Sequence, residues 1–353
     1  MIAGANVATV VILFLVGHSD YINPVSHPVL SNVGLLFPGF LLINLGFMFF
    51  WLLFKLRYAL IPFFGFLLCY APVRRYMPLN VGHEAPDSAL KVLSYNVLNY
   101  GSDETGENEI NPIVDYIQRQ EADIVCLQEA MPNSESKSAQ VDTILRPMYP
   151  YYDLFCRPNG GDCLAVFSKY PILSKEQIEY ESKGNLSVAY RLKIRGREVL
   201  LINNHLETTG LSLEERAQFK KMLKGKLQTD TAEQTSKTLA AKLGEATKKR
   251  APQAEAVATY VKKHKGTSII LCGDFNDGPI SYAHRIISEG LTDCYAESGN
   301  GPGISYHYSG FFVRIDNIMC SKDWIPYGCK VDAEISTSDH YPIICRLKST
   351  RNL

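Results

Sequence analysis

The first 54 residues of this chain contain almost no charge: Asp20 is the single charged side chain among them. A segment so poor in charge cannot form an ordinary water-facing surface. Residues 33–54 carry no charge over 22 positions, long enough to cross a hydrocarbon layer of about 30 Å at about 1.5 Å per residue. The alternative is a helix buried in a protein core. Basic residues at 55 and 57, followed at once by another apolar run, favour a membrane span.

Two other features are absent. The nine cysteines include no Cys-x-x-Cys pair, which excludes the usual cysteine-based metal sites. Residues 77–353 have no basic excess, with 32 basic and 35 acidic side chains, which argues against a dedicated nucleic-acid binder. Cys156 and Cys163 are close enough in sequence to form a disulfide, but nothing in the sequence requires one. Three other cysteines lie in apolar strand-like runs and are predicted core residues: Cys126, Cys272 and Cys345.

The apolar part of the chain, residues 1–76, is expected to form about three transmembrane helices, at 2–17, 33–54 and 58–73. The first run has neither the basic start nor the small-x-small cleavage site of a secretory signal. The third run is the shortest and contains two prolines, so we expect it to tilt or to span only partly.

The orientation of these helices is nearly balanced. Lys55 and Arg57 favour a cytoplasmic loop between the second and third helices, whereas Arg74 and Arg75 favour the opposite arrangement with the same count. Large domains cross membranes with little regard to nearby charge, so we expect the remainder of the chain on the outer face.

A polar linker, residues 77–88, leads into a series of short apolar segments with strand character. The expected strands are 90–97, 123–128, 163–167, 188–194, 198–204, 268–272, 313–319 and 342–347. Residues 110–121 are a predicted helix. Strands outnumber the helices between them, so residues 89–350 are predicted to form an α/β domain of packed sheets with helices outside.

Residues 211–250 differ from the rest of this domain and are predicted to be a helical insertion. Ser212, with Glu215 three positions on, is a typical helix start. Lysines cluster at 220–226 and again at 248–249. We favour a solvated helical pair over the alternative, a basic lid or membrane-facing arm above a site.

Asp274 and Asn276 follow an apolar strand directly. In an extended segment their side chains share one face, and Gly273 permits close approach of backbone or ligand. Asp-x-Asn also occurs in ordinary turns. As catalytic residues, Asp274 would orient an attacking water and Asn276 would bind a phosphoryl oxygen.

The last two strands carry a second set of polar residues. Asp316 is predicted to accept a hydrogen bond from His340 and so to fix its tautomer. Asp339 would then be free for a metal ion or water. Arg314 would share a face with Asp316, and a simple ion pair between them is the alternative.

Three more candidates follow strands earlier in the chain. Asn96 could hold a metal-bound or phosphate oxygen, although Asn at a strand end is usually a turn former. Glu129 ends a buried strand and is a candidate Mg²⁺ ligand, with a surface loop position as the alternative. His205 could stabilise charge on a phosphoryl oxygen, with Asn203 as a possible neighbour.

Taken together, these segments resemble the endonuclease/exonuclease/phosphatase superfamily, which includes DNase I-like nucleases, neutral sphingomyelinases and inositol polyphosphate 5-phosphatases. The resemblance covers about residues 88–349 and rests on Tyr95-Asn96-Val97, Gln128-Glu129, Asn203-x-His205, Gly273-Asp274-Phe275-Asn276, Arg314-Ile-Asp316 and Ser338-Asp339-His340. It implies a four-layer α/β sandwich of two mixed sheets flanked by helices, and Mg²⁺ or Mn²⁺ as cofactor. The apolar N-terminus is similar to that of bacterial members, especially from Bacteroidetes.

The resemblance also implies roles for individual residues. Metal ligands would be Asn96, Glu129 and Asp339; catalytic residues would be His205, Asp274, Asn276, Asp316 and His340; substrate-binding residues would be Asn203 and Arg314.

The expected function is a membrane-anchored, divalent-metal-dependent phosphoesterase that uses in-line attack by water. Its partners would be the lipid bilayer, through residues 1–76, and a lipid head group, nucleotide or nucleic acid. We expect it in a bacterial inner membrane with the catalytic domain on the periplasmic face. A non-specific DNase I-like endonuclease and a catalytically silent membrane binding module remain as alternatives.

Overall fold

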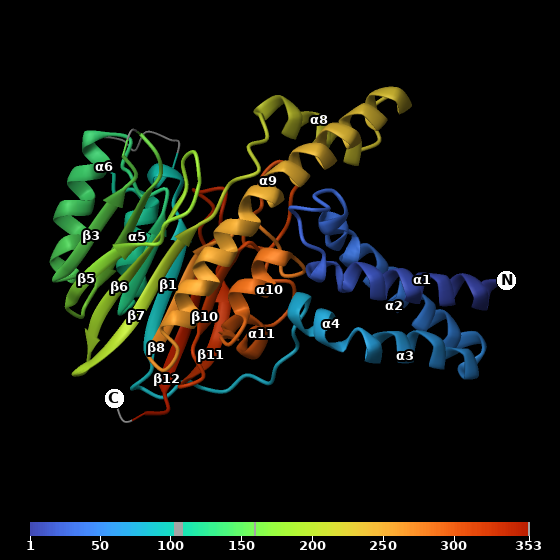
Figure 1. Cartoon of the computed structure of the whole chain (residues 1–353), viewed down its shortest axis with the longest axis horizontal. Coiled ribbons are helices and arrows are strands. Elements are labelled where there is room, and N and C mark those ends of the chain that lie inside the picture. The colour runs from blue at the N-terminus through green and yellow to red at the C-terminus, as the bar shows by residue number, and fades with distance from the viewer. Residues whose placement is uncertain (102–108, 159, 352–353) are drawn as a thin grey trace.

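Two six-stranded β-sheets pack face to face in the computed structural model (Figure 1). The model describes residues 1–101, 109–158 and 160–351. The first sheet has the order β11-β12-β1-β2-β4-β3 and consists of β1 (Leu90–Asn96), β2 (Ile124–Gln128), β3 (Tyr151–Cys156), β4 (Cys163–Ser168), β11 (Trp324–Val331) and β12 (Ile343–Ser349). The second has the order β5-β6-β7-β8-β10-β9 and consists of β5 (Ile172–Gln177), β6 (Leu186–Ile194), β7 (Arg197–His205), β8 (Ser268–Asp274), β9 (Thr292–Asp293) and β10 (Asp316–Cys320).

Both sheets are mixed: β1 runs parallel to β2, β7 runs parallel to β8, and the other pairs are antiparallel. Helices cover the two outer faces. The first sheet carries α5 (Pro112–Gln120), α6 (Glu135–Gln140) and α7 (Arg146–Met148), and the second carries α9 (Thr229–Lys263) and α10 (Tyr282–Ser288). The short helix α11 (Cys294–Ser298) contacts both β10 and β11, and its buried Cys294 and Tyr295 pack into the inter-sheet core. The predicted four-layer α/β sandwich is therefore confirmed.

Strand alternation decides which residues face the gap between the sheets. In β1, Val92 packs into the inter-sheet core, whereas Leu93 packs toward the helices. In β8, Ile270 and Cys272 face the inter-sheet core, whereas Leu271 faces outward. Any polar residue that continues the inward series therefore ends up between the two sheets.

The helix start expected at Ser212 is present, and the second helix of this region extends beyond residue 250. Ser212 and Glu215 form a reciprocal capping box at the start of α8 (Leu213–Leu223). The following helix, α9, continues through Pro252 to residue 263. Its C-terminal half is bound to the second sheet because Ala254 and Val257 are buried against it, and this packing outweighs the helix-breaking tendency of proline.

Among the described residues, two apolar helical segments are long and apolar enough to cross a membrane, 2–21 and 30–54. They contain α1 (Ile2–Gly17) and α2 (Phe37–Phe54). The expected third helix is broken into α3 (Leu60–Leu68) and α4 (Tyr70–Tyr76), which are bent by 71°. Proline supplies no N–H for the helical ladder, and Pro72 lies in the first turn of α4, after the break at Cys69.

Gly273 is the glycine position at which the fold most firmly excludes a side chain. Its φ is 135°, and a Cβ there would lie 2.0 Å from the carbonyl oxygen of Asn204 on β7. We expect Gly273→Ala to lower the free energy of unfolding by at least about 3 kcal/mol, because both backbone strain and overpacking oppose it.

Gly278→Ala is the matched control, since an added Cβ there meets no described atom within 4 Å. Chemical denaturation of both full-length variants in detergent micelles measures the difference. A loss at Gly273 of less than about 1 kcal/mol would show that the β7–β8 pairing tolerates a methyl group.

Candidate active site

The polar residues gather where the inter-sheet face reaches the end of its central strands. Asn96 ends β1, His205 ends β7 and Asp274 ends β8, each continuing the inward series of its strand. Asp316 starts β10 directly opposite Asp274 in the antiparallel register. Strands from both sheets thus deliver their functional groups to one end of the gap.

Two histidine–aspartate pairs flank one buried carboxylate. The Nδ1 atom of His340 lies 2.8 Å from Oδ2 of Asp316, as predicted from the sequence. The Nδ1 atom of His205 lies 2.6 Å from Oδ2 of Asp162. The Nε2 atoms of both imidazoles lie 3.6 Å from the same Oδ2 of Asp274. Each histidine therefore has one nitrogen held by an aspartate and the other turned toward Asp274.

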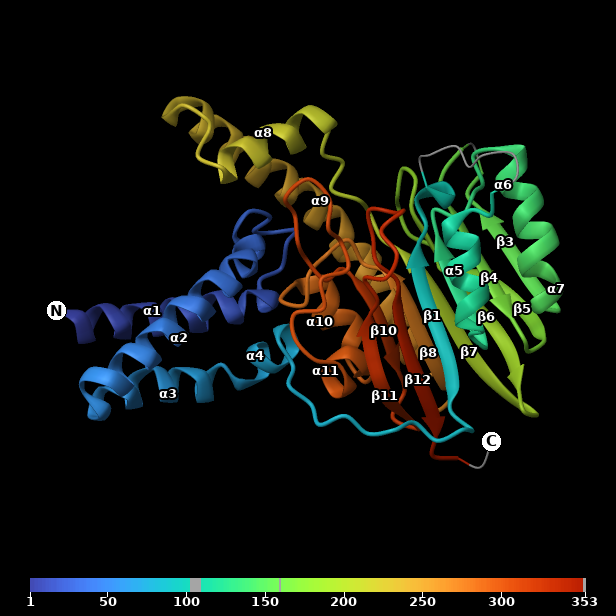
Figure 2. The ribbon, with the colours of Figure 1, turned by 180° about the vertical axis from the view of Figure 1, so that it is seen from behind.

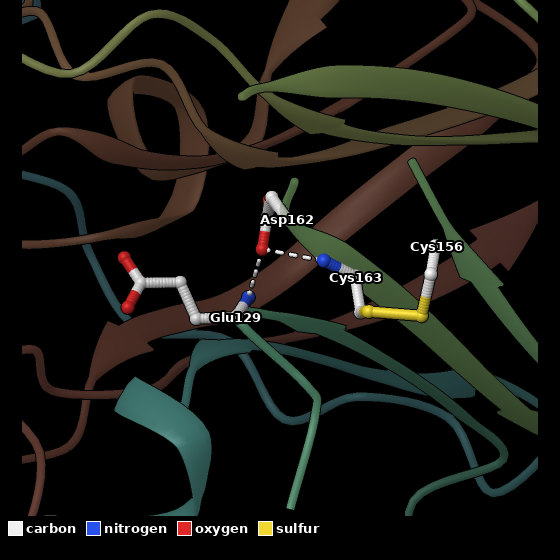
Figure 3. Close-up of a disulfide and its surroundings, with 4 residues drawn as sticks. All are labelled: Glu129, Cys156, Asp162 and Cys163. Carbon is white, nitrogen blue, oxygen red and sulfur yellow. Dashed lines mark hydrogen bonds between the residues drawn. A yellow bond between two sulfur atoms is a disulfide. The ribbon is translucent and has the colours of Figure 1, made fainter. Parts of the chain in front are cut away.

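Asp162 is the functional residue that sequence reasoning missed. Its Oδ1 accepts hydrogen bonds from the backbone N–H groups of Glu129, at 3.1 Å, and Cys163, at 2.7 Å (Figure 3). Cys163 is also bonded to Cys156 in a disulfide across β3 and β4. Asp162 consequently links the loop after β2, the β3–β4 hairpin and the imidazole of His205.

Asn96 connects Glu129 to Asp274 through hydrogen bonds. The amide Nδ2 of Asn96 donates to Oε1 of Glu129 and to Oδ2 of Asp274, each at 3.2 Å. Glu129 has a left-handed backbone, with φ of 50°, which turns the chain out of β2. Its Oε1 is 4.0 Å from Nε2 of His205.

A pocket of about 140 Å³ opens above this cluster. Asn276 and Asp339 line it together with Glu129, Asp274 and His340. Asn276 has φ of 51°; its backbone N–H donates to Oδ1 of Asp274 at 2.7 Å, and its side-chain amide donates to the Leu206 carbonyl at 3.0 Å. The pocket floor therefore offers carboxylate, amide and imidazole groups at one point.

Burial and neighbouring charges oppose each other at these groups. Burial lowers the pKa of His205, but the adjacent Asp162, followed by Asp274 and Glu129, raises it to about 10. The pKa of His340 is raised to about 10 in the same way, chiefly by Asp316, against the effect of burial. Burial is the main cause that raises the pKa of Asp274 to about 6, while the charge of His340 opposes it. Both imidazoles are therefore cationic at neutral pH.

Neither Asn203 nor Arg314 lines this pocket, although Arg314 lines an adjoining hollow, and their substrate-binding role stays a prediction. Asn203 lies two residues deeper than His205, where its amide donates to the carbonyls of Leu127 and Ala165 across the inter-sheet gap. Arg314 precedes β10, so strand alternation does not govern it. Its buried guanidinium stacks on Tyr295 and donates to backbone carbonyls outside the site.

The charges of the cluster fit a bound cation. The two imidazoles are accompanied by five carboxyl groups: Glu129, Asp162, Asp274, Asp316 and Asp339. With all seven ionised, three negative charges remain in excess, which is costly in a buried setting. Within the described ranges, Oδ1 of Asp316 is buried without a hydrogen-bond partner.

Two sets of residues could hold such a cation. Ligand atoms of Asp274, Asp316 and His340 lie within 4.8 Å of one another. Because Asp316 and His340 already share a hydrogen bond, a cation there would compete with it. Glu129 and Asp339 line the pocket with carboxylate oxygens, which match the preference of Mg²⁺. Asn96 faces Glu129 with its amide nitrogen, and its Oδ1 accepts a hydrogen bond from the N–H of Leu98 at 3.2 Å.

Solved structures support the same architecture at low sequence identity. A truncated TDP2 from Caenorhabditis elegans is 15% identical over 75% of this chain and 99% of its own, with a TM-score of 0.52. Danio rerio TDP2 complexed with a single-strand DNA product is 17% identical over 74% of this chain and 100% of its own, also with a TM-score of 0.52. A Bacteroides vulgatus protein of the endonuclease/exonuclease/phosphatase type is 16% identical, covers 74% of this chain and 100% of its own, and has a TM-score of 0.50.

Among curated proteins, none matches this sequence. Residues 1–76 match a domain family of unknown function, DUF8431. Residues 93–340, which include every predicted site residue, match the family described as Endonuclease/Exonuclease/phosphatase. Since that match spans well over half of the chain, the protein belongs to the endonuclease/exonuclease/phosphatase family.

Proposed function

We propose that this protein is a membrane-anchored, divalent-metal-dependent phosphoesterase that hydrolyses a phosphodiester or phosphomonoester by in-line attack of water. One observation carries the proposal: a buried carboxylate, Asp274, lies between two imidazoles that are each fixed by their own aspartate. A general base between two positioned proton donors is the arrangement that water attack on phosphorus requires.

In this mechanism each residue has a separate task. Asp274 accepts a hydrogen bond from the attacking water and orients it. His340, held by Asp316, donates toward a phosphoryl or leaving oxygen, and His205 does the same from the opposite side. Asn276 contributes its amide to a phosphoryl oxygen at the pocket floor. The paired aspartates keep both imidazoles protonated and in one orientation.

Asn96, Glu129 and Asp339 are the residues we propose to hold Mg²⁺ or Mn²⁺. When bound, such a cation polarises the phosphoryl group and neutralises its charge. The excess of acidic groups around the pocket supports this assignment.

The N-terminal helices are proposed to be an anchor in the bacterial inner (plasma) membrane. Large apolar side chains such as Leu42 and Phe49 are 68% and 71% exposed, which suits lipid rather than water. The disulfide Cys156–Cys163 supports an oxidising compartment, so we propose the periplasmic face for the catalytic domain.

A DNase I-like endonuclease is a weaker candidate. The pocket is bordered on one side by Asn32 and Leu35 from the anchor and on another by Leu211 and Leu243 from the insertion. Walls on two sides restrict the approach of a rigid duplex. A silent binding module is weaker still, because recognition alone does not require two aspartate-fixed imidazoles around a buried carboxylate.

The first test concerns the metal ion and the imidazole together. We expect the full-length protein to hydrolyse bis-p-nitrophenyl phosphate in the presence of Mg²⁺, and EDTA to reduce turnover at least about 10²-fold. His340→Ala should lower kcat about 10²-fold or more, because the negative charge that develops on the phosphoryl or leaving oxygen loses its proton donor. His83→Ala, at an exposed linker position, is the control. Absent turnover, or metal-independent turnover that His340→Ala leaves unchanged, would favour the binding module.

The second test concerns Asp162 as a positioning residue. Asp162→Asn retains an oxygen that can accept the N–H groups of Glu129 and Cys163 but loses the charge beside His205. We expect kcat to fall roughly 10²-fold with little change in KM, because the imidazolium is no longer stabilised. Asp142→Asn, which removes an exposed carboxylate on the domain surface, should have wild-type kinetics.

Asp162→Glu, which restores the charge, should recover part of the lost rate. If Asp162→Asn and wild type have the same kcat at equal thermal stability, the pair formed by His205 and Asp162 does not contribute to catalysis.

A further inference from the structure

The apolar helices are fixed to the catalytic domain by buried polar contacts. Asp20, the single charged residue among the first 54, is fully buried and forms an ion pair with Arg75 at 2.6 Å between Oδ2 and Nη1. The Asp20 carbonyl accepts a hydrogen bond from Arg285 of α10 at 2.9 Å. The Arg75 carbonyl accepts one from Arg314, the residue next to β10 that the sequence had assigned to substrate. These contacts hold the anchor at a defined place beside the active site.

The anchor also forms part of the active-site wall. Asn32 and Leu35, from the 3-10 helix η2 (Leu30–Leu36), line the same pocket as Asp274 and His340. Asn32 is held there because its Oδ1 accepts a hydrogen bond from Oγ1 of Thr247 on α9, at 3.0 Å. The remaining apolar wall consists of Leu211, Leu243, Phe311, Val313 and Ile315. The pocket thus has a charged floor and walls that are partly apolar, with Arg216, Arg250 and Asp277 also in the lining.

A second hollow, of about 150 Å³, adjoins this pocket. The two share five lining residues, among them Leu35 and Val313. The second hollow continues to Phe312, to Tyr76 at the end of α4 and to Pro38 in the first turn of α2. The other three shared residues are Asn32, Asp277 and Gly278. The two hollows therefore connect the catalytic floor with the start of a candidate membrane span along the apolar side chains of Leu35, Val313 and Phe312, beside polar groups.

The surface around these two hollows is unusually apolar for a water-facing enzyme. Leu36 is 56% exposed, Phe312 is 59% exposed and Leu213, at the start of α8, is 75% exposed. In both views α8 and the N-terminal half of α9 extend past the sheets on the same side as the apolar helices (Figures 1 and 2). Lysines 220, 221, 224 and 226 on this projection are exposed, as attraction to anionic head groups requires.

We propose that the substrate is an amphiphilic phosphoester taken from the bilayer, with its phosphate on the floor formed by Asp274 and His340 and its apolar chain along Leu35 and Phe312. This inference rests on the proposed phosphoesterase function. Burial of the substrate's apolar chain would also hold its ester group in alignment with the catalytic groups.

The reaction at the ester is simple hydrolysis. The oxygen of water bonds to phosphorus, the P–O bond to the leaving group breaks, and the leaving oxygen takes up a proton. No oxidant, reductant or further reactant is needed, so the chain segment of the substrate has only a binding role.

The experiment compares two esters with the same reacting group. Full-length protein in phosphatidylcholine vesicles is supplied with Mg²⁺ and either hexadecyl p-nitrophenyl phosphate or ethyl p-nitrophenyl phosphate, and nitrophenol release is followed. We expect kcat/KM for the hexadecyl ester to exceed that for the ethyl ester at least about tenfold. Leu35→Gln and Phe312→Gln should each reduce this ratio about tenfold, because the apolar wall is interrupted.

Leu173→Gln is the matched control: Leu173 lies on β5, is 53% exposed and borders neither hollow, so the ratio should stay at the wild-type value. Hydrolysis of both esters at similar kcat/KM, or a ratio that neither Leu35→Gln nor Phe312→Gln changes, overturns the amphiphilic-substrate inference and leaves the phosphoesterase intact. Absence of turnover on both esters and on bis-p-nitrophenyl phosphate overturns the phosphoesterase and the inference together.

Discussion

The site depends on one electrostatic arrangement, the burial of the Asp274 carboxylate between two protonated imidazoles. A buried anion without partners costs several kcal/mol, and at Asp274 each partner is itself held by an aspartate. Asp316 and His205 lie on strands of the second sheet, whereas their partners His340 and Asp162 lie in loops that lead into β12 and β4 of the first sheet. The charge balance at Asp274 therefore exists only when the two sheets meet in this register, which makes the site a product of the inter-sheet packing.

Much of this site could be predicted from sequence because strand alternation is local. The inward series of β8 runs through Cys272 to Asp274, and the apolar residues before it reveal its direction. Asp162 could not be found in this way, since it precedes β4 in a loop and its partners lie just after β2 and at the end of β7. Asn203 faces the gap between the sheets, as strand alternation predicts, but it lies deeper in the gap than His205. Alternation gives the face on which a side chain lies, not its distance from the pocket. Arg314 lies before the first residue of β10, so strand alternation does not predict which way its side chain faces.

The N-terminal helices show a similar division between local and long-range information. The charge-poor composition of residues 1–54 is a local property and predicted apolar helices correctly. The third helix was expected as one segment, but the chain bends by 71° at the break before Pro72. The sequence also contained a clue in Asp20, whose presence in an otherwise uncharged stretch called for a buried partner. That partner, Arg75, is 55 residues away and was recognisable only from the fold.

The docking of the anchor has a physical consequence for the enzyme as a whole. Leu35 lines the catalytic pocket and belongs to a candidate span. In the membrane placement that we propose, the same short segment therefore sets the position of the bilayer relative to the catalytic floor. A flexible tether would merely raise the local concentration of lipid esters. A docked anchor, as we propose here, would instead present them in a fixed orientation, which contributes to catalysis because a reacting ester must align with water and base. We therefore interpret the buried ion pair of Asp20 and Arg75 as the contact that keeps Leu35 beside Asp274.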